Sequence, residues 1–206
     1  MTTGHRRSRQ QQQTFFRPDW QHQLSHGGVL RNQRRGRSAR PLSCKEPLHA
    51  VFKVNRNRLK LKSLRAPRTF ALILKILKHY SALFGIKVEQ ISLQHDHLHL
   101  LLRTSRRNQF HAFFRVLSGQ MAQRFQSEGF LSATNTLSPP VRGIVQQAGT
   151  RLWMYRPFSR VVRGYRAYKT VRNYIELNEK EATGQIRYQK RRLRGLSSGD
   201  WDILWN

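Results

Sequence analysis

Apolar and polar side chains alternate with a period of two in several short stretches of this chain, a pattern typical of strands that bury one face. Residues 48–54 form the first such stretch. Residues 86–93 and 97–103 form two more, and the polar residues 94–96 between them predict a tight turn and an antiparallel pair. Residues 152–162 predict a further strand or two.

Three other segments repeat their apolar side chains with the period of a helix. The first, residues 67–84, begins at Pro67, which suits the first turn of a helix, and Gly85 follows as a C-terminal cap. The second and third helices are predicted over residues 109–125 and 165–182. We expect the apolar stripe of the second helix to lie in the core, and it consists of Phe110, Phe113, Phe114, Leu117, Met121 and Phe125.

The N-terminal segment contains many Arg and Gln, almost no acidic side chains and no sustained apolar period. We expect residues 1–42 to be a basic arm that is disordered when free. Phe15, Phe16 and Trp20 interrupt this arm. Aromatic side chains among arginines can stack on unpaired bases, and they can equally form a short patch that docks on the domain, so both interpretations stay open.

One domain is predicted between the two flanking segments, over residues 43–184. Inside it, residues 127–150 are rich in Gly, Ser, Thr and Pro and predict a long surface loop. Residues 185–206 form a basic C-terminal tail that ends in Trp201 and Trp205. The sequence leaves open whether these two indoles dock on the domain.

The chain carries 39 Lys and Arg against 10 Asp and Glu, a formal net charge of +29. Such a charge opposes compaction unless an anionic partner offsets it, and nucleic acid is the partner we expect. A membrane surface is a weaker candidate, because no uninterrupted apolar run approaches the roughly 20 residues that span a bilayer. Cys44 is the single cysteine, which excludes an intrachain disulfide and a cysteine-rich zinc module. We therefore expect a soluble, cytoplasmic protein of a prokaryote, associated with the nucleoid and with no membrane partner.

The most informative stretch is the third predicted strand, which contains His97 and His99. Successive side chains of a strand point to opposite faces, so the two histidines share one face while Leu98, Leu100 and Leu102 line the core face. Two neighbouring imidazoles form a metal-ligand pair, and any further ligand would be a carboxylate, an amide or water. The alternative is a half-buried strand whose polar face carries ordinary surface histidines.

Tyr174 and Asn178 lie four residues apart on the third predicted helix, and therefore on one face of it. Such a pair alone also fits a half-buried helix tyrosine beside a surface amide. Tyr174 differs from the competing tyrosines in having an amide side chain four residues downstream. These competitors are Tyr155, Tyr165, Tyr168 and Tyr188.

With these two motifs, the chain resembles the single-tyrosine HUH transposases, the superfamily of insertion-sequence-200-like and REP-associated tyrosine transposases. Residues 97–99 match the histidine-hydrophobic-histidine triplet, and residues 174–178 match the Tyr-x-x-x-(Asn/Gln) helix motif. The order of the predicted elements agrees with the family over residues 42–184. Glu179 departs from the REP-associated subgroup, which usually has Pro at this position.

The resemblance implies an α+β fold, a ferredoxin-like antiparallel sheet with helices packed on one face, flanked here by basic disordered arms. It implies that His97, His99 and Asn178 bind a divalent metal, Mg²⁺ or Mn²⁺, and that Tyr174 is the nucleophile. The implied reaction is DNA transposition, in which single-stranded or hairpin DNA is cut and joined through a 5′-phosphotyrosine intermediate. Relatives differ in whether the tyrosine helix serves its own or a partner's histidines, so a monomer and a homodimer both stay open.

Two other functions stay open on the residues alone. A non-catalytic, basic nucleic-acid-binding protein, domesticated or decayed from such an enzyme or binding RNA without a metal, has the same charge pattern. A replication initiator or relaxase uses the same histidine triplet, although many members have a different chain order. The side chains that we expect to contact nucleic acid are Arg56, Arg58, Arg65, Arg103, Arg106, Arg107, Arg160 and Arg163.

Overall fold

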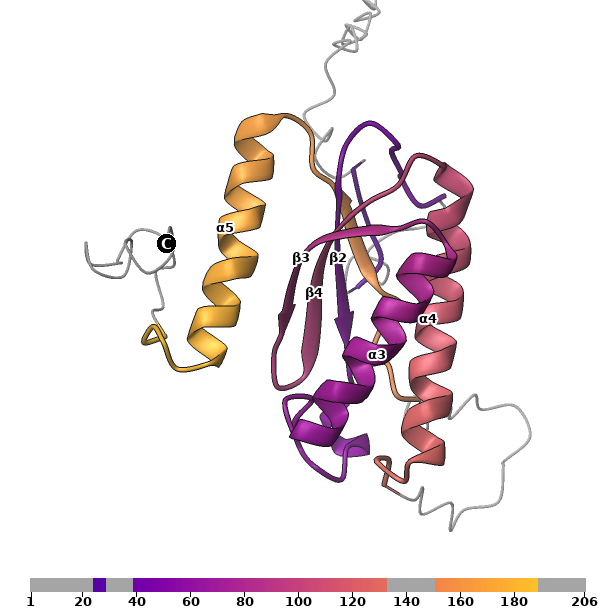
Figure 1. Ribbon diagram of the computed structural model, residues 1–206, viewed down its shortest axis with the longest axis vertical. Coiled ribbons are helices and arrows are strands. Elements are labelled where there is room, and N and C mark those ends of the chain that lie inside the picture. The colour runs from indigo at the N-terminus through magenta and orange to yellow at the C-terminus, as the bar shows by residue number, and fades with distance from the viewer. Residues whose placement is uncertain (1–23, 29–38, 133–150, 189–206) are drawn as a thin grey trace, which may run out of the picture.

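The computed structural model describes residues 24–28, 39–132 and 151–188, and its centre is an antiparallel sheet of five strands (Figure 1). In the order of the sheet, the strands are β1 (Ser25–His26), β5 (Phe158–Val161), β2 (Leu48–Lys53), β4 (His97–Arg103) and β3 (Lys87–Leu93). The helices of this described part are a short 3-10 helix (Arg56–Arg58), α3 (Pro67–Leu83), α4 (Arg107–Ser127) and α5 (Tyr165–Ala182). The predicted α+β fold with an antiparallel sheet is thus confirmed.

Most predicted elements have nearly the predicted bounds. β4 and α5 agree with the prediction at both ends, and α4 is longer by two residues at each end. Gly85 ends α3 as expected, because its φ of +59° is a conformation that glycine adopts without strain. Val54 lies just beyond β2 and forms an isolated bridge with Trp153. None of the helices in the described segments is long and apolar enough to cross a membrane.

The main hydrophobic core lies between the sheet and the layer formed by α3 and α4 (Figure 1). Leu98, Leu100 and Leu102 of β4 point into this core and are buried, as the period-two pattern predicts. All six side chains of the apolar stripe on α4 are buried as well. Because the back of β4 is packed into this core, its opposite face is held in a fixed position.

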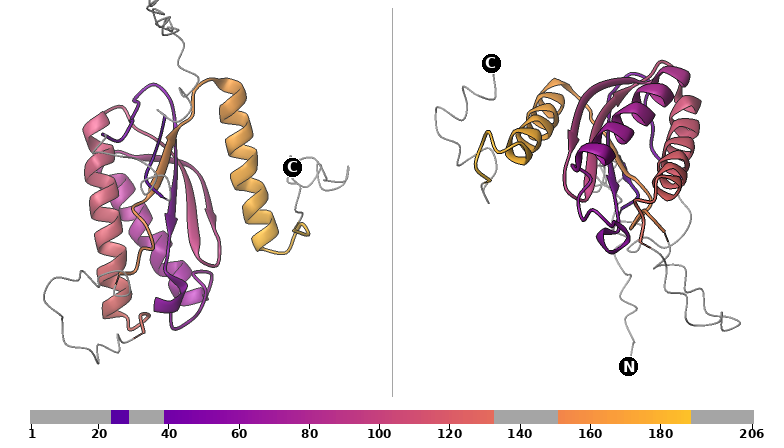
Figure 2. Two further views of the ribbon diagram at one scale, coloured as in Figure 1. Left: turned by 180° about the vertical axis from the view of Figure 1, so that it is seen from behind. Right: turned by 60° about the horizontal axis from the view of Figure 1, so that its bottom comes forward.

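The third helix, α5, lies on the side of the sheet opposite to α3 and α4 (Figure 2). Here a much smaller hydrophobic cluster forms from Leu101, Val162 and Ile175. Leu101 belongs to β4, and the strand period places it on the same face as the two histidines. The expectation of helices on one face therefore holds for α3 and α4, whereas α5 covers the histidine face.

Part of the arm that we expected to be disordered is ordered. β1 pairs antiparallel with β5 at the edge of the sheet. Arg40 donates hydrogen bonds to Ser159 Oγ and to the Pro157 carbonyl at 2.5 and 2.9 Å, and its guanidinium lies 4.8 Å from the centre of the Phe114 ring. Burial and the nearby Arg156 lower the pKa of Arg40 to about 10. Backbone pairing and one half-buried arginine leave no apolar period in the sequence, which explains why the hydrophobic pattern did not predict that this part of the arm is ordered.

Several predictions concern residues outside the described part of the chain. They are the roles of Phe15, Phe16 and Trp20, the loop beyond residue 132, and the C-terminal tail with Trp201 and Trp205.

Candidate active site

His97 and His99 project from one face of β4, as the sequence predicts, and α5 covers this face. Their ring centroids are 4.8 Å apart and the ring planes are nearly perpendicular, at 80°. His99 is almost fully enclosed, with 5% of its surface exposed, whereas His97 is half-buried. The pair therefore has one inner imidazole and one imidazole at the rim, where a substrate can reach it.

Tyr174 of α5 lies directly against the inner histidine. The centroids of the Tyr174 and His99 rings are 5.6 Å apart, with the planes at 89°, so one ring meets the other edge to face. Asn178 lies one helical turn beyond Tyr174, and only 3% of its surface is exposed. Its backbone carbonyl accepts a hydrogen bond from Gln94 Nε2 in the β3–β4 turn at 2.7 Å. The fold thus brings the tyrosine helix and the histidine strand together.

The competing tyrosines have different surroundings. Tyr165 and Tyr188 are largely exposed, at 77% and 64% of their surfaces. Tyr168 is half-buried, and the guanidinium of Arg103 lies 5.5 Å from the centre of its ring. Tyr155 is in the segment that precedes β5. Tyr174 is the tyrosine of this group whose ring lies against His99.

A third histidine, His49 of β2, belongs to the same cluster, and the sequence analysis missed it. His49 Nε2 lies 3.1 Å from His99 Nδ1, within hydrogen-bond distance, and the two rings stack at 5.4 Å with only 12° between their planes. His49 also meets the Tyr174 ring edge on, at 6.5 Å. The strand alternation could have found it, because Leu48 and Ala50 face the main core and His49 between them must point to the opposite face.

The imidazole of His49 is held neutral. Burial lowers its pKa to about 4, and the positive charge of Arg160 adds to this effect. Arg160 is the β5 residue directly opposite His49 in the sheet. At neutral pH, His49 therefore has one donor and one acceptor nitrogen, and it can exchange a single hydrogen bond with His99.

Asp96 binds the other site histidine. Its Oδ1 lies 2.6 Å from His97 Nδ1, and because a carboxylate can only accept, the proton of this hydrogen bond is on His97 Nδ1. Burial by itself raises the pKa of the Asp96 carboxyl, but the hydrogen bond and electrostatic interaction with His97, together with the positive charge of Lys53, hold it below its ordinary value. The Glu176 carboxylate of α5 lies 3.9 Å from Lys180 instead.

These contacts define which atoms are available to a metal ion. The Nδ1 atoms of His97 and His99 are both engaged, by Asp96 and His49 respectively, which leaves their Nε2 atoms as the natural ligands. Carboxylate-histidine contacts of this kind accompany metal-binding imidazoles in many proteins. No group of three His, Cys, Asp or Glu side chains with metal-binding geometry occurs in the described residues. A metal on this pair therefore needs other ligands, and the amide of Asn178 is of a suitable type.

The eight arginines that we expected at a nucleic acid differ in how free their guanidinium groups are. Arg103 donates to Glu89 Oε1 at 2.7 Å and to the Lys45 carbonyl at 3.2 Å, and Arg65 pairs with Glu179 at 2.8 Å. These two side chains therefore bind protein atoms, and Arg58 is also buried. Arg160 is half-buried beside His49, and the remaining four are exposed, namely Arg56, Arg106, Arg107 and Arg163.

Comparison with solved structures finds a REP-associated tyrosine transposase bound to a REP hairpin, with a TM-score of 0.52 and 12% sequence identity. The match covers 74% of this chain and 76% of that chain. A putative transposase from Deinococcus radiodurans R1 matches with a TM-score of 0.39 and 18% identity, over 71% of this chain and 98% of the other. No protein-family model and no curated protein matches the sequence. The chain therefore has the fold of a single-tyrosine transposase, as its two motifs implied.

Proposed function

We propose that this protein is a metal-dependent transesterase of the transposase type, which cuts and joins DNA through Tyr174. The observation that carries the proposal is the contact between Tyr174 and His99, whose ring centroids are 5.6 Å apart although the residues lie on different elements. A phenol beside a pair of imidazoles with engaged Nδ1 atoms combines a nucleophile with a metal-ligand pair. If the two sequence motifs matched the family only by chance, there would be no reason for Tyr174 and His99 to meet in the fold.

In the proposed reaction, Tyr174 Oη attacks a DNA phosphorus. A bond forms between the phenol oxygen and phosphorus, the bond from phosphorus to the 3′ oxygen breaks, the phenol proton leaves, and the 3′ oxygen takes up a proton. The products are a 5′-phosphotyrosine and a free 3′-hydroxyl, and no nucleoside triphosphate is needed because one phosphodiester replaces another.

The divalent metal, proposed as Mg²⁺ or Mn²⁺, would be held by the Nε2 atoms of His97 and His99 and by Asn178. When bound, it supplies Lewis-acid polarisation of the scissile phosphate. His49 and Asp96 orient the two imidazoles through their Nδ1 atoms, and α5 places the phenol beside them. Imidazole ligands also suit Zn²⁺ and other transition metals, so the choice of Mg²⁺ or Mn²⁺ rests on the family resemblance.

We propose single-stranded or hairpin DNA as the substrate. The net charge of +29 provides attraction to phosphates, and four of the predicted arginines are exposed. The transposase of similar fold is bound to a REP hairpin, which supports DNA of this kind as the partner. A DNA substrate would place the protein at the nucleoid of a prokaryotic cell.

The test is an oligonucleotide cleavage assay with Mn²⁺, with Mg²⁺ and with EDTA, read out as a covalent protein-DNA adduct on a denaturing gel. Tyr174→Phe removes the attacking oxygen, so we expect no adduct while the dissociation constant for DNA stays within about twofold. The matched control is Tyr165→Phe on the same helix, where the ring is 77% exposed and away from the histidines. An adduct with Tyr174→Phe would contradict the nucleophile, and DNA binding by the wild type without any adduct would favour the non-catalytic alternative.

A further inference from the structure

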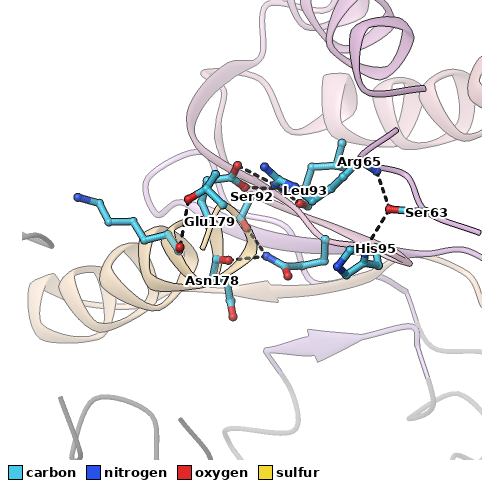
Figure 3. Close-up of polar contacts among 10 residues, drawn as sticks. Ser63, Arg65, Ser92, Leu93, His95, Asn178 and Glu179 are labelled. Carbon is cyan, nitrogen blue, oxygen red and sulfur yellow. Dashed lines mark hydrogen bonds and ion pairs between the residues drawn. The ribbon is translucent and has the colours of Figure 1, made fainter. Parts of the chain in front are cut away.

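We propose that Arg65, Gln94 and Glu179 form a clamp that fixes α5 on the sheet, and that Glu179 is thereby a positioning residue for Tyr174. This inference rests on the proposed function for its catalytic consequence, although the clamp itself can be tested without activity. We call the three side chains, with the backbone of Leu93 that Arg65 and Glu179 bind, the helix clamp (Figure 3).

Glu179 of α5 uses both of its carboxylate oxygens at the end of β3 (Figure 3). Its Oε1 accepts a hydrogen bond from Arg65 Nη1 at 2.8 Å, and its Oε2 accepts one from the Leu93 backbone N–H at 3.0 Å. Arg65 Nη1 also donates to the Leu93 carbonyl at 2.6 Å. The three groups close a ring, so the helix and the strand cannot separate without breaking charge-assisted hydrogen bonds.

The position of Leu93 explains why such a ring can form there. Within the described segments, β3 is an edge strand of the sheet, and one side of its backbone has no neighbouring strand there. The N–H and C=O groups of Leu93 are engaged by side chains, one from Glu179 and one from Arg65. The clamp thus gives partners to the exposed edge of β3 and attaches α5 to it.

Gln94 adds a second connection one residue further along the turn. Its Nε2 donates to the backbone carbonyl of Asn178 at 2.7 Å and to Ser92 Oγ at 2.8 Å. Asn178 is the proposed metal ligand on α5, so this bond holds the backbone of a site residue directly. Glu179 and Asn178 are consecutive, and the two connections therefore fix the same turn of the helix.

Arg65 is itself held in place, which makes it a firm anchor. Ser63 Oγ accepts a hydrogen bond from the Arg65 backbone N–H at 3.1 Å, and it lies 2.9 Å from His95 Nδ1 in the β3–β4 turn (Figure 3). The Leu64 N–H donates to the His95 carbonyl at 2.8 Å. The Arg65 guanidinium also lies 5.7 Å from the centre of the Phe70 ring. The loop before α3 and the histidine hairpin thus support the clamp together.

The layer under α5 makes a polar attachment important. The hydrophobic cluster between α5 and the sheet has three buried members and four half-buried ones, far fewer side chains than the core under α3 and α4. The buried members are Leu101, Val162 and Ile175, and the half-buried ones are Ala167, Tyr168, Val171 and Tyr174. A helix with so small an apolar contact gains little from burial, so local opening of α5 costs less than global unfolding. Glu179 follows Tyr174 by five residues, about 7.5 Å along the helix axis, so movement at the clamp displaces the phenol.

The clamp differs from an ordinary surface ion pair. The side chains of Arg65 and Glu179 are only 18% and 30% exposed, and each also binds the backbone of Leu93. Exposed ion pairs between two flexible side chains contribute little to stability, because solvent screens their charges and fixing both side chains costs conformational entropy. Glu176 and Lys180 form a longer ion pair, 3.9 Å apart and similarly half-buried, which joins two positions of α5 itself. Glu176 therefore offers a matched control on the same helix.

The first test measures hydrogen exchange in the full-length protein without DNA, for Glu179→Ala and Glu176→Ala. Both variants remove one carboxylate from α5, but only the first breaks the clamp. We expect faster exchange over residues 165–182 and 92–95 in Glu179→Ala, with the rest of the domain unchanged, and exchange like that of the wild type in Glu176→Ala. Equal exchange in both variants and the wild type would overturn the clamp.

The second test measures the rate of adduct formation at saturating DNA, together with the dissociation constant, well below the thermal midpoint of each variant. We expect Glu179→Ala to slow adduct formation about 10-fold or more with a dissociation constant within about twofold of the wild type. Glu179→Gln keeps an acceptor for the Leu93 N–H and should recover part of the rate. Faster exchange with an unchanged rate would overturn the positioning role.

A double-mutant cycle shows whether the two charged residues act as one unit. If they do, the double variant with Arg65→Ala and Glu179→Ala slows adduct formation no more than either single variant. If the two residues act independently, the fold-losses of the single variants multiply in the double variant, and this result would overturn the clamp. A wild type that forms no adduct would contradict the proposed function and leave hydrogen exchange to decide the clamp, so the two failures are distinguishable.

Discussion

His49 shows how a single residue completes the site without being near it in the sequence. It lies fifty residues before His99, and its Nε2 is within 3.1 Å of His99 Nδ1. A metal-binding imidazole needs its other nitrogen protonated or engaged, so that the ring keeps one orientation and the ligand nitrogen keeps its lone pair. Burial lowers the pKa of His49 to about 4 and keeps it neutral, so it can serve as the acceptor for His99 Nδ1–H.

We therefore expect His49→Leu to weaken Mn²⁺ binding about 10- to 100-fold, the usual effect of losing a partner that orients a metal ligand. His49→Gln keeps a polar group near His99 and should lose less. Isothermal titration or Mn²⁺ electron paramagnetic resonance measures the affinity directly, without DNA. The control is His79→Leu, an exposed histidine on α3. Equal Mn²⁺ affinity in His49→Leu and the wild type would show that His49 has no role in orienting His99.

At the scale of elements, the sheet keeps the two functional layers apart. β4 buries its leucines against α3 and α4 and presents its histidines to α5, so one strand connects the large core with the site. Two attachments lie at the sheet edges, that of β1 to β5 on one side and that of α5 to β3 on the other. Both depend on polar and backbone contacts more than on apolar burial.

The edge strand β1 depends on one glycine. Gly27 has a φ of +82°, and a Cβ there would lie 2.2 Å from the Pro157 carbonyl oxygen, a contact that no side chain adjustment relieves. We expect Gly27→Ala to release β1 from β5, with a loss of about 1–2 kcal/mol for the backbone conformation alone. Urea denaturation and hydrogen exchange at residues 158–161 measure the effect.

Gly129→Ala is the matched control for this variant. Its φ is +68°, but nothing lies within 4 Å of an added Cβ, so it carries the conformational cost without the clash. Unchanged exchange in β5 of Gly27→Ala would mean that β1 does not depend on the close approach at residue 27.

At the scale of the whole molecule, the tyrosine helix packs on the sheet of its own chain. Tyr174 meets His99 of its own sheet, and the helix clamp attaches the following turn to the same hairpin. One chain therefore brings Tyr174 and the two histidines together. The large positive charge adds repulsion between copies in the absence of DNA.

We therefore expect attack by Tyr174 within its own chain. Tyr174→Phe keeps the histidines but lacks the nucleophile, and His99→Ala keeps the tyrosine but lacks a metal ligand. A mixture of the two variants should form no adduct above the sum of the separate proteins, measured on a denaturing gel with chains of different length. An adduct on the His99→Ala chain in the mixture would show that the tyrosine helix serves a partner.

The sequence by itself determined the features that depend on local periodicity. The period of two on β4 placed the leucines in the core and both histidines on the opposite face, and the helical period identified the buried stripe of α4 and the shared face of Tyr174 and Asn178. These predictions succeed because neighbouring residues in a strand or helix have fixed relative directions whatever the rest of the chain does.

Only the tertiary structure decided which distant residues meet. His49 and His99 are 50 residues apart, and Arg65 and Glu179 are 114 apart, so no local pattern relates them. The placement of α5 on the histidine face and the pairing of β1 with β5 likewise depend on how separate elements pack. The reason is physical: a side chain's direction follows from its own element, whereas its partners follow from the free energy of packing the whole chain.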